Sequence, residues 1–249
     1  MKIFLILLFV AEAFSFTPHR TPTQWKIVGG GMAATGEFPY QISLRINGKH
    51  ACGGSILNPN TILTAAHCIV SGPESMQVVT GTNLISGDGD VYNVRSVTTH
   101  EDYNAAKFTN DIALLHLSSN IKYNDLVQPI GLDSSVVGAN VKCVLSGWGL
   151  TSYPGSASTD LRYIRLKTIS NKACAEKHSS SKYPITDEEV CTYNRVDEGV
   201  CRGDSGGPLV TEQKQIGIVS WGKACARGYP DVFTRVSAYV DWIEKNLNN

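Results

Sequence analysis

Residues 199–208 read GVCRGDSGGP, and four of the ten are glycine. A cysteine and a proline leave only Arg202, Asp204 and Ser205 for polar side-chain chemistry. A serine hydroxyl is a weak nucleophile at neutral pH unless a general base takes its proton. Asp204 is the sequence neighbour of Ser205, but adjacent side chains seldom point the same way, so we expect the base elsewhere in the chain.

Residues 203–207 formally match G-x-S-x-G, the nucleophile turn of the α/β-hydrolases, in which a histidine follows the serine in the chain. The next residues include a proline and a β-like run, PLV, instead of the helix that this turn requires. No histidine follows Ser205, because the six histidines are His19, His50, His67, His100, His116 and His178. The order of residues therefore excludes the α/β-hydrolase arrangement.

Short apolar runs alternate with clusters of glycine, asparagine, aspartate, serine and proline, and such spacing indicates an all-β sandwich or barrel. One sustained helix is expected at the end of the chain, where apolar residues recur at three- and four-residue intervals from Val236 to Leu247. The apolar runs are QISLRI (41–46), SILN (55–58), TILTAAHC (61–68), QVVTG (77–81), DIALLHL (111–117), VKCVLSGWG (141–149), QIGIVSWG (215–222) and VFTRV (232–236).

His67 is the candidate base. The two alanines before it permit close backbone packing, and Cys68 after it could fix its loop covalently. A base of this kind needs a carboxylate that holds its tautomer and stabilises the imidazolium. Asp111 stands at the head of an apolar run, where a charge is costly to bury unless a partner compensates. We therefore choose Asp111 as the acid, and interpret His116 in the same run as structural.

The first 15 residues, MKIFLILLFVAEAFS, contain one lysine, an apolar run and small residues, which is the pattern of a secretory signal peptide. A membrane anchor would need about 18 or more apolar residues, and no segment reaches that length. Residues 16–26 are polar and indicate an activation propeptide, which leaves 27–249 as the folded domain. The sequence thus predicts a secreted, extracellular protein.

The chain has 22 basic and 22 acidic residues, a balance that favours neither nucleic acid nor an anionic membrane as a partner. Seven cysteines in an extracellular chain indicate disulfides with one thiol left over, although spacing alone does not determine the pairing. No Cys-x-x-Cys pair occurs, so we expect neither a metal site nor a cofactor. The cysteines are at positions 52, 68, 143, 174, 191, 201 and 225.

Six motifs, in this order, resemble the trypsin–chymotrypsin family of serine proteases: IVGG (27), LTAAHC (63), NDIALLHL (110), SGWG (146), GDSGGP (203) and SWG (220). The resemblance runs from Ile27 to the C-terminal helix and is strongest to insect chymotrypsins and crustacean brachyurins. It implies two antiparallel six-stranded β-barrels, with the catalytic triad His67, Asp111 and Ser205 in the cleft between them. A monomer with protein or peptide substrates and protein protease inhibitors as partners is expected.

The resemblance also implies how the active state forms. A trypsin-like activating protease would cleave after Lys26, and the new α-amino group of Ile27 would pair with Asp204. The backbone amides of Gly203 and Ser205 would form the oxyanion hole.

The implied disulfides are Cys52–Cys68, Cys174–Cys191 and Cys201–Cys225. Cys143 departs from the pattern, because Thr211 stands where the family usually has its partner. We expect Cys143 to be a free, buried thiol.

The specificity pocket is expected between residues 199–205 and 220–222, with 228–233 on its far side. Trypsins have an aspartate six positions before the nucleophile, where this chain has Gly199. Asp231 instead stands where vertebrate trypsin and chymotrypsin carry glycine, so a carboxylate is expected to enter from the wall. Ser220, Trp221 and Gly222 complete the predicted pocket, and Gly222 leaves its entrance open.

This pocket predicts cleavage after aromatic and leucine residues. One alternative is a trypsin-like or broad collagenolytic protease that uses Asp231 to bind basic side chains. Another is a catalytically silent relative that acts as a binding partner, although such proteins usually lack the serine, and Ser205 is present.

Overall fold

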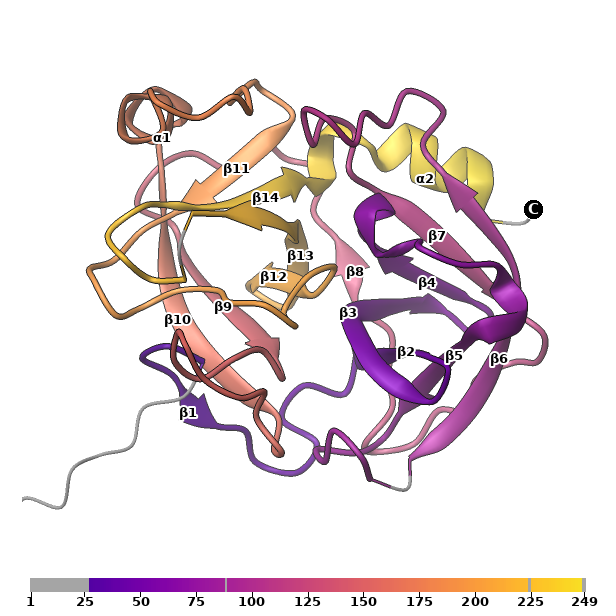
Figure 1. Cartoon of the computed structure of the whole chain (residues 1–249). Coiled ribbons are helices and arrows are strands. Elements are labelled where there is room, and N and C mark those ends of the chain that lie inside the picture. The colour runs from indigo at the N-terminus through magenta and orange to yellow at the C-terminus, as the bar shows by residue number, and fades with distance from the viewer. Residues whose placement is uncertain (1–26, 88, 224, 248–249) are drawn as a thin grey trace, which may run out of the picture.

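The computed structural model describes residues 27–87, 89–223 and 225–247. The first half of the chain forms a closed antiparallel barrel, at the right of Figure 1. Its strands follow the order β2 (Gln41–Ile46), β3 (Lys49–Asn58), β4 (Thr61–Thr64), β7 (Ala113–Leu117), β6 (Asp90–Thr99) and β5 (Met76–Thr80), and β5 pairs with β2.

The second half forms another six-stranded antiparallel barrel, which closes where β9 pairs with β10. Two short strands add to it: β1 (Gly31–Met32) pairs with β10, and β8 (Gly131–Leu132) runs parallel to β13. The predicted double barrel is therefore confirmed. The order of the six strands is β9 (Lys142–Gly147), β10 (Arg162–Ile169), β11 (Glu189–Thr192), β14 (Asp231–Arg235), β13 (Lys214–Gly222) and β12 (Pro208–Thr211).

The C-terminal helix is present but shorter than predicted. A 3₁₀ turn, η3 (Val236–Ala238), precedes α2 (Val240–Asn246), and Tyr239 between them has a non-helical φ of −124°. Among the described residues, two further 3₁₀ turns occur, η1 (Ala66–Cys68) and η2 (Pro73–Ser75).

The sequence did not predict α1 (Asn171–Lys177), which buries only Cys174 and begins where the Ser170 hydroxyl accepts a hydrogen bond from the Ala173 amide. Within the described residues, no helix combines the length and apolar character needed to cross a membrane.

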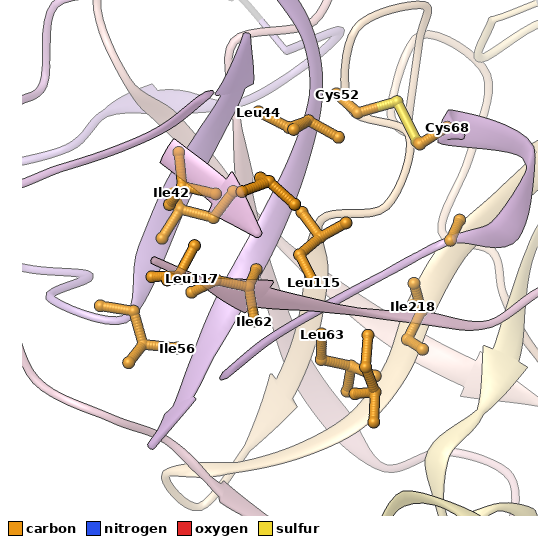
Figure 2. Packing of buried hydrophobic residues seen from close by; sticks show 14 of the residues in the cluster. Ile42, Leu44, Cys52, Ile56, Ile62, Leu63, Cys68, Leu115, Leu117 and Ile218 are labelled. Atoms are coloured by element: carbon orange, nitrogen blue, oxygen red, sulfur yellow. A yellow bond between two sulfur atoms is a disulfide. The ribbon is translucent and has the colours of Figure 1, made fainter. Parts of the chain in front are cut away.

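The core of the first barrel consists mainly of branched aliphatic side chains, several of which Figure 2 shows. Burying each contributes about 1.5–3 kcal/mol relative to leaving it exposed. Ile218 from β13 and Ile243 from α2 belong to the same cluster, so the second barrel and the C-terminal helix complete this core. The residues labelled in Figure 2 are Ile42, Leu44, Cys52, Ile56, Ile62, Leu63, Cys68, Leu115, Leu117 and Ile218.

The disulfides join the pairs that the resemblance implies: Cys52 to Cys68, Cys174 to Cys191, and Cys201 to Cys225. Cys143 is a free thiol with 5% of its surface exposed, and burial raises its pKa to about 12. A thiol held in its neutral form is a poor nucleophile and metal ligand.

The register of β12 against β9 predicts where a fourth disulfide would fit. Val210 pairs with Val144, so Thr211 is the next residue toward Cys143 across the strands. We expect Thr211→Cys to form a bond with Cys143 and to stabilise the fold by about 2–4 kcal/mol. Alkylation and intact-mass analysis should then find no free thiol, and two alkylated cysteines would contradict the register.

Candidate active site

Two hydrogen bonds hold His67 against a fully buried carboxylate. The Asp111 Oδ2 atom lies 2.7 Å from His67 Nδ1, and Oδ1 accepts the backbone amide of His67 at 2.8 Å. Asp111 has 0% of its surface exposed. Because the Asp111 carboxylate accepts a hydrogen bond from Nδ1–H, the neutral imidazole presents a lone pair at Nε2. The arrangement therefore prepares Nε2 as a general base.

The local sequence explains why the two side chains meet. Strand β4 ends at Thr64, and the small Ala65 and Ala66 allow the chain to enter the tight turn η1 that contains His67. Opposite it, Asn110 adopts a left-handed conformation with φ of 54°, which asparagine tolerates better than most residues. The turn at Asn110 directs Asp111 inward just before β7.

The serine loop returns to the same place from the second barrel. The backbone oxygen of Ser205 accepts the Gly53 amide at 2.7 Å, and Gly53 follows Cys52, which is bonded to Cys68 beside His67. Ser220, on β13, donates its hydroxyl to Asp111 Oδ2 at 2.6 Å. Ser220 lines the same hollow as Ser205, and it also contacts Asp111, which holds His67. The three predicted triad residues therefore lie at the seam between the barrels.

The glycines of this loop are explained by close contacts. Gly206 has φ of 75°, and a Cβ there would overlap the Thr64 hydroxyl and the Gly53 carbonyl. Gly203 has φ of 99°, and its Cβ would lie 3.1 Å from the Gly149 Cα atom. Only a residue without a Cβ takes these conformations at little cost.

The amides of Gly203 and Ser205 donate no hydrogen bond to any group in the described part of the chain. They are therefore available to a substrate oxygen, as the predicted oxyanion hole requires. His50, which the sequence did not single out, supports this turn: its Nε2 donates to the Gly203 carbonyl at 3.0 Å. Its Nδ1 accepts from the Ser43 hydroxyl at 2.8 Å, and burial lowers the pKa of His50, which keeps it neutral.

The Asp204 side chain points into the protein and away from the Ser205 hydroxyl. It has 0% of its surface exposed, and its carboxylate accepts the amides of Gly149 at 2.8 Å and Cys201 at 3.0 Å. Burial raises its pKa to about 6 in spite of these two bonds. Gly147 and Gly149 make room for this carboxylate, because a Cβ at either would overlap it.

The start of the predicted domain packs next to this loop. Ile27 is fully buried in the cluster that contains Val200, and the Val28 carbonyl accepts the Gly199 amide at 3.1 Å. Lys26 and the predicted signal peptide and propeptide lie outside the described residues. A backbone hydrogen bond thus connects the segment that would carry the new amino terminus to Gly199 of the predicted specificity pocket.

A hollow of about 310 Å³ opens beside Ser205. The predicted pocket residues Ser220, Trp221 and Gly222 line it, together with Val200 and Cys225. Sequence reasoning missed Tyr153 and singled out no pocket role for Arg202, yet both also line it. The Arg202 guanidinium lies over the Tyr153 ring at 5.4 Å, a contact between segments too far apart for any sequence signal to reveal.

Asp231 and Gly199 lie behind the lining of this hollow and fit each other. The Asp231 carboxyl accepts the Val200 amide at 2.9 Å and occupies the space that a side chain at position 199 would take. The carboxyl, which comes from strand β14, therefore takes the place of a side chain at position 199. Burial raises its pKa to about 8, the charge of Asp204 adds to the shift, and the Val200 bond opposes it.

An aromatic surface extends from His67 past this hollow. The Phe108 ring lies 5.6 Å from the His67 ring, Tyr183 lies 5.1 Å from Phe108, and Trp221 lies 5.1 Å from Tyr183. These rings come from separate loops and strand β13, so the sequence alone did not place them together. They offer apolar contact to a peptide that extends from the hollow.

Cys52, His67 and Cys68 could formally hold a metal ion, because their ligand atoms all lie within 4.8 Å of one another. The two sulfurs form a disulfide, however, and a disulfide sulfur cannot act as a thiolate ligand. The cluster is better explained as the covalent support of the His67 turn.

Comparison with known proteins places this geometry among proteases. The family model described as trypsin matches residues 27–243. Chymotrypsin-2 of Vespa crabro is 43% identical over 222 residues, which cover 88% of this chain and 99% of that protein. Trypsin alpha-4 of Lucilia cuprina is 38% identical with 88% and 86% covered, and trypsin I-P1 of Gallus gallus is 39% identical over the full length of both chains.

The fit between Gly199 and Asp231 can be tested by a double-mutant cycle. We expect Gly199→Ala to destabilise the fold by about 1–3 kcal/mol, because the added methyl group overlaps the Asp231 carboxyl. Combination with Asp231→Gly should remove the part of this cost that comes from the overlap, whereas the strain of a side chain at φ of 155° remains in both variants. Urea unfolding of the four proteins measures the coupling, and additive effects would contradict the proposed contact.

Proposed function

The chain belongs to the trypsin family of serine proteases, and from this membership we propose that it is an endopeptidase with Ser205 as nucleophile and a preference for aromatic and leucine residues before the scissile bond. The observation that carries the proposal is the hydrogen-bonded pair of His67 and buried Asp111 at the hollow that Ser205 lines. The arrangement supplies a base, a nucleophile and free amide donors at one place.

In the proposed reaction, Ser205 Oγ attacks the substrate carbonyl carbon while His67 Nε2 takes the hydroxyl proton. The carbonyl oxygen gains negative charge and accepts the amides of Gly203 and Ser205. His67 then gives its proton to the leaving amine, which departs and leaves an acyl ester on Ser205. Water repeats the two steps, with His67 again as base, and releases the acid. Asp111 stays ionised and stabilises the imidazolium in each step.

Specificity for aromatic and leucine side chains follows from the neutral Asp231 carboxyl behind the pocket lining. At neutral pH the raised pKa of Asp231 keeps most of this carboxyl protonated, so it offers little attraction to a cation. An aromatic ring loses only two torsions on binding and contributes about 2–3 kcal/mol through burial. A lysine or arginine loses more rotamer freedom and gains no ion pair.

Asp231 also supports a second candidate, trypsin-like cleavage after lysine or arginine, and two of the relatives above are named trypsins. The carboxyl lies behind the pocket lining, between Gly199 and Gly222, where a cationic side chain could approach it once ionised. A silent, purely binding role is disfavoured, because His67, Asp111 and Ser205 are all present and His67 is held in the orientation of a base.

We further propose that the protein is secreted as a zymogen and activated by a trypsin-like protease. Residues 1–15 would be the signal peptide and 16–26 the propeptide, and cleavage after Lys26 would free the Ile27 amino group to pair with Asp204. Burial of both Ile27 and the Asp204 carboxylate supports this pairing, since a buried carboxylate gains most from a cationic partner. Protein substrates and protein protease inhibitors would be its partners, and a monomer its state.

The first test concerns the nucleophile. Ser205→Ala should lower kcat for a peptide amide by about a thousandfold or more, because the hydroxyl is the only group that forms a covalent bond to the substrate. Thermal unfolding and inhibitor binding should be unchanged in the same variant. Retention of full turnover would disprove the assignment of Ser205.

The second test uses the pH dependence of selectivity. At pH 7 we expect kcat/KM for a Phe substrate to exceed that for a matched Arg substrate by at least about tenfold. As pH rises through the Asp231 pKa of about 8, this carboxyl loses its proton and becomes anionic. The ratio of kcat/KM for the Arg substrate to that for the Phe substrate should therefore increase.

The matched control is Asp231→Asn, which keeps an oxygen for the Val200 amide but cannot ionise. Titration of other groups affects both substrates and cancels in the ratio, so this variant should show a low ratio that does not change with pH. Equal cleavage after Arg and Phe at pH 7 would favour the trypsin-like candidate. An unchanged pH slope in Asp231→Asn would show that another group controls selectivity.

A further inference from the structure

Two adjoining hollows lie on the outside of the second barrel, and neither shares a lining residue with the hollow at Ser205. One, of about 720 Å³, is bounded by β9, β10 and residues 193–198. The other, of about 540 Å³, is bounded by residues 37–40 and 128–130. They have Val144, Arg165, Val210 and Glu212 in common, so they form one continuous surface depression, which we term the trough.

The larger end of the trough carries cations that no carboxylate neutralises. Lys142 on β9 and Lys167 on β10 are direct cross-strand partners, and Arg165 lies two residues along the same exposed face. In the described part of the chain, none of the three forms an ion pair. Like charges directly opposite in a sheet destabilise it. An anion placed over this pair would relieve the repulsion.

Other groups at this end already have partners. Arg195 pairs with Glu198, so these two side chains cancel. The Arg165 guanidinium lies over the Tyr163 ring at 5.0 Å and donates to its hydroxyl at 3.3 Å, which positions the cation without neutralising it. Glu212 also lines this end, but Lys142, Lys167 and Arg165 outnumber it, so the larger end has an excess of positive charge on a chain with no net charge.

The smaller end of the trough is apolar and has the opposite electrostatic character. Phe38, Pro39, Tyr40, Pro129 and Ile130 line it. Glu37 is its own acidic group, whereas Glu212 and Arg165 line both ends and offset each other, so an anion is less favoured here than at the larger end. A uniformly sulfated polysaccharide would suit the cationic end but not this one. A polypeptide can present carboxylates and an apolar side chain a few residues apart, and so matches both ends.

We propose that the trough binds an extended acidic peptide segment of a partner protein, with its carboxylates over Lys142, Lys167 and Arg165 and an apolar side chain in the hollow between Pro39 and Pro129. This docking site is separate from the proposed catalytic machinery. It would hold a substrate or regulator while leaving the hollow at Ser205 free.

Fluorescence anisotropy with the full-length Ser205→Ala protein tests the proposal, because the probe cannot then be cut. The probe is a fluorescein-labelled peptide with four consecutive glutamates, a Gly-Gly spacer and a terminal Leu-Phe. We expect saturable binding at low salt that weakens strongly at 0.5 M salt, where screening shortens to a few ångströms. Replacement of Leu-Phe by Ser-Ser should weaken binding several-fold.

Charge reversal locates the site. Lys142→Glu with Lys167→Glu should weaken binding of the probe at least tenfold. The control reversal Lys49→Glu with Lys122→Glu, on exposed lysines of β3 and of the segment after β7, should change affinity less than twofold. Equal losses in both variants would show only general attraction between the peptide and the protein, and would overturn the proposal. The proposal would also be overturned if a sulfated polysaccharide displaced the Ser-Ser probe and the Leu-Phe probe equally well.

The single substitution Lys142→Glu separates loss of binding from loss of fold. It places a carboxylate opposite Lys167, so it should weaken binding of the probe while raising the melting temperature of the protein. A lower melting temperature would contradict the cross-strand repulsion on which the proposal rests. Because hydrolysis is not measured, failure of the docking site leaves the proposed proteolysis intact, and failure of the proteolysis leaves the binding result unaffected.

Discussion

The buried carboxylate of Asp111 joins the two barrels and orients the candidate base with the same atoms. Its oxygens accept His67 from the first barrel and Ser220 from the second, and its backbone carbonyl accepts the Thr234 hydroxyl at 2.8 Å. An ionised group with no exposed surface is tolerated only when such partners surround it. Correct docking of the barrels and correct orientation of His67 therefore depend on each other, which explains why the site lies at the seam.

Two more buried carboxyls shape the serine loop, and glycines surround both. Gly147 and Gly149 leave room for Asp204, and Gly199 leaves room for Asp231. The two acids differ in effect: Asp204 accepts one amide of the loop, Cys201, and one from the segment after β9, Gly149, whereas Asp231 accepts only Val200 and has the higher pKa. One glycine of the quoted motif, Gly199, is thus required by an acidic residue that is distant in sequence, Asp231 on strand β14.

The sequence predicted what short-range patterns encode and missed what distant segments build together. Apolar runs located β2, β4 and β13, but β10 alternates exposed and buried residues and was not recognised. Asp111 could be chosen because a charge in an apolar run needs a partner. The contact of His50 with Gly203 spans 153 residues, and the fit of Asp231 against Gly199 depends on strand register, so neither left a local signal. The resemblance supplied the disulfide pairing, which spacing could not.

Covalent labelling tests most directly whether this seam activates a serine. A fluorophosphonate reacts with a serine hydroxyl only when a neighbouring base removes its proton, and peptide mapping by mass spectrometry identifies the modified residue. The account predicts one adduct per cleaved protein molecule, on Ser205, and none after His67→Ala, which leaves Ser205 in place. No adduct on the cleaved protein, an adduct on another residue, or equal labelling without His67 would contradict it.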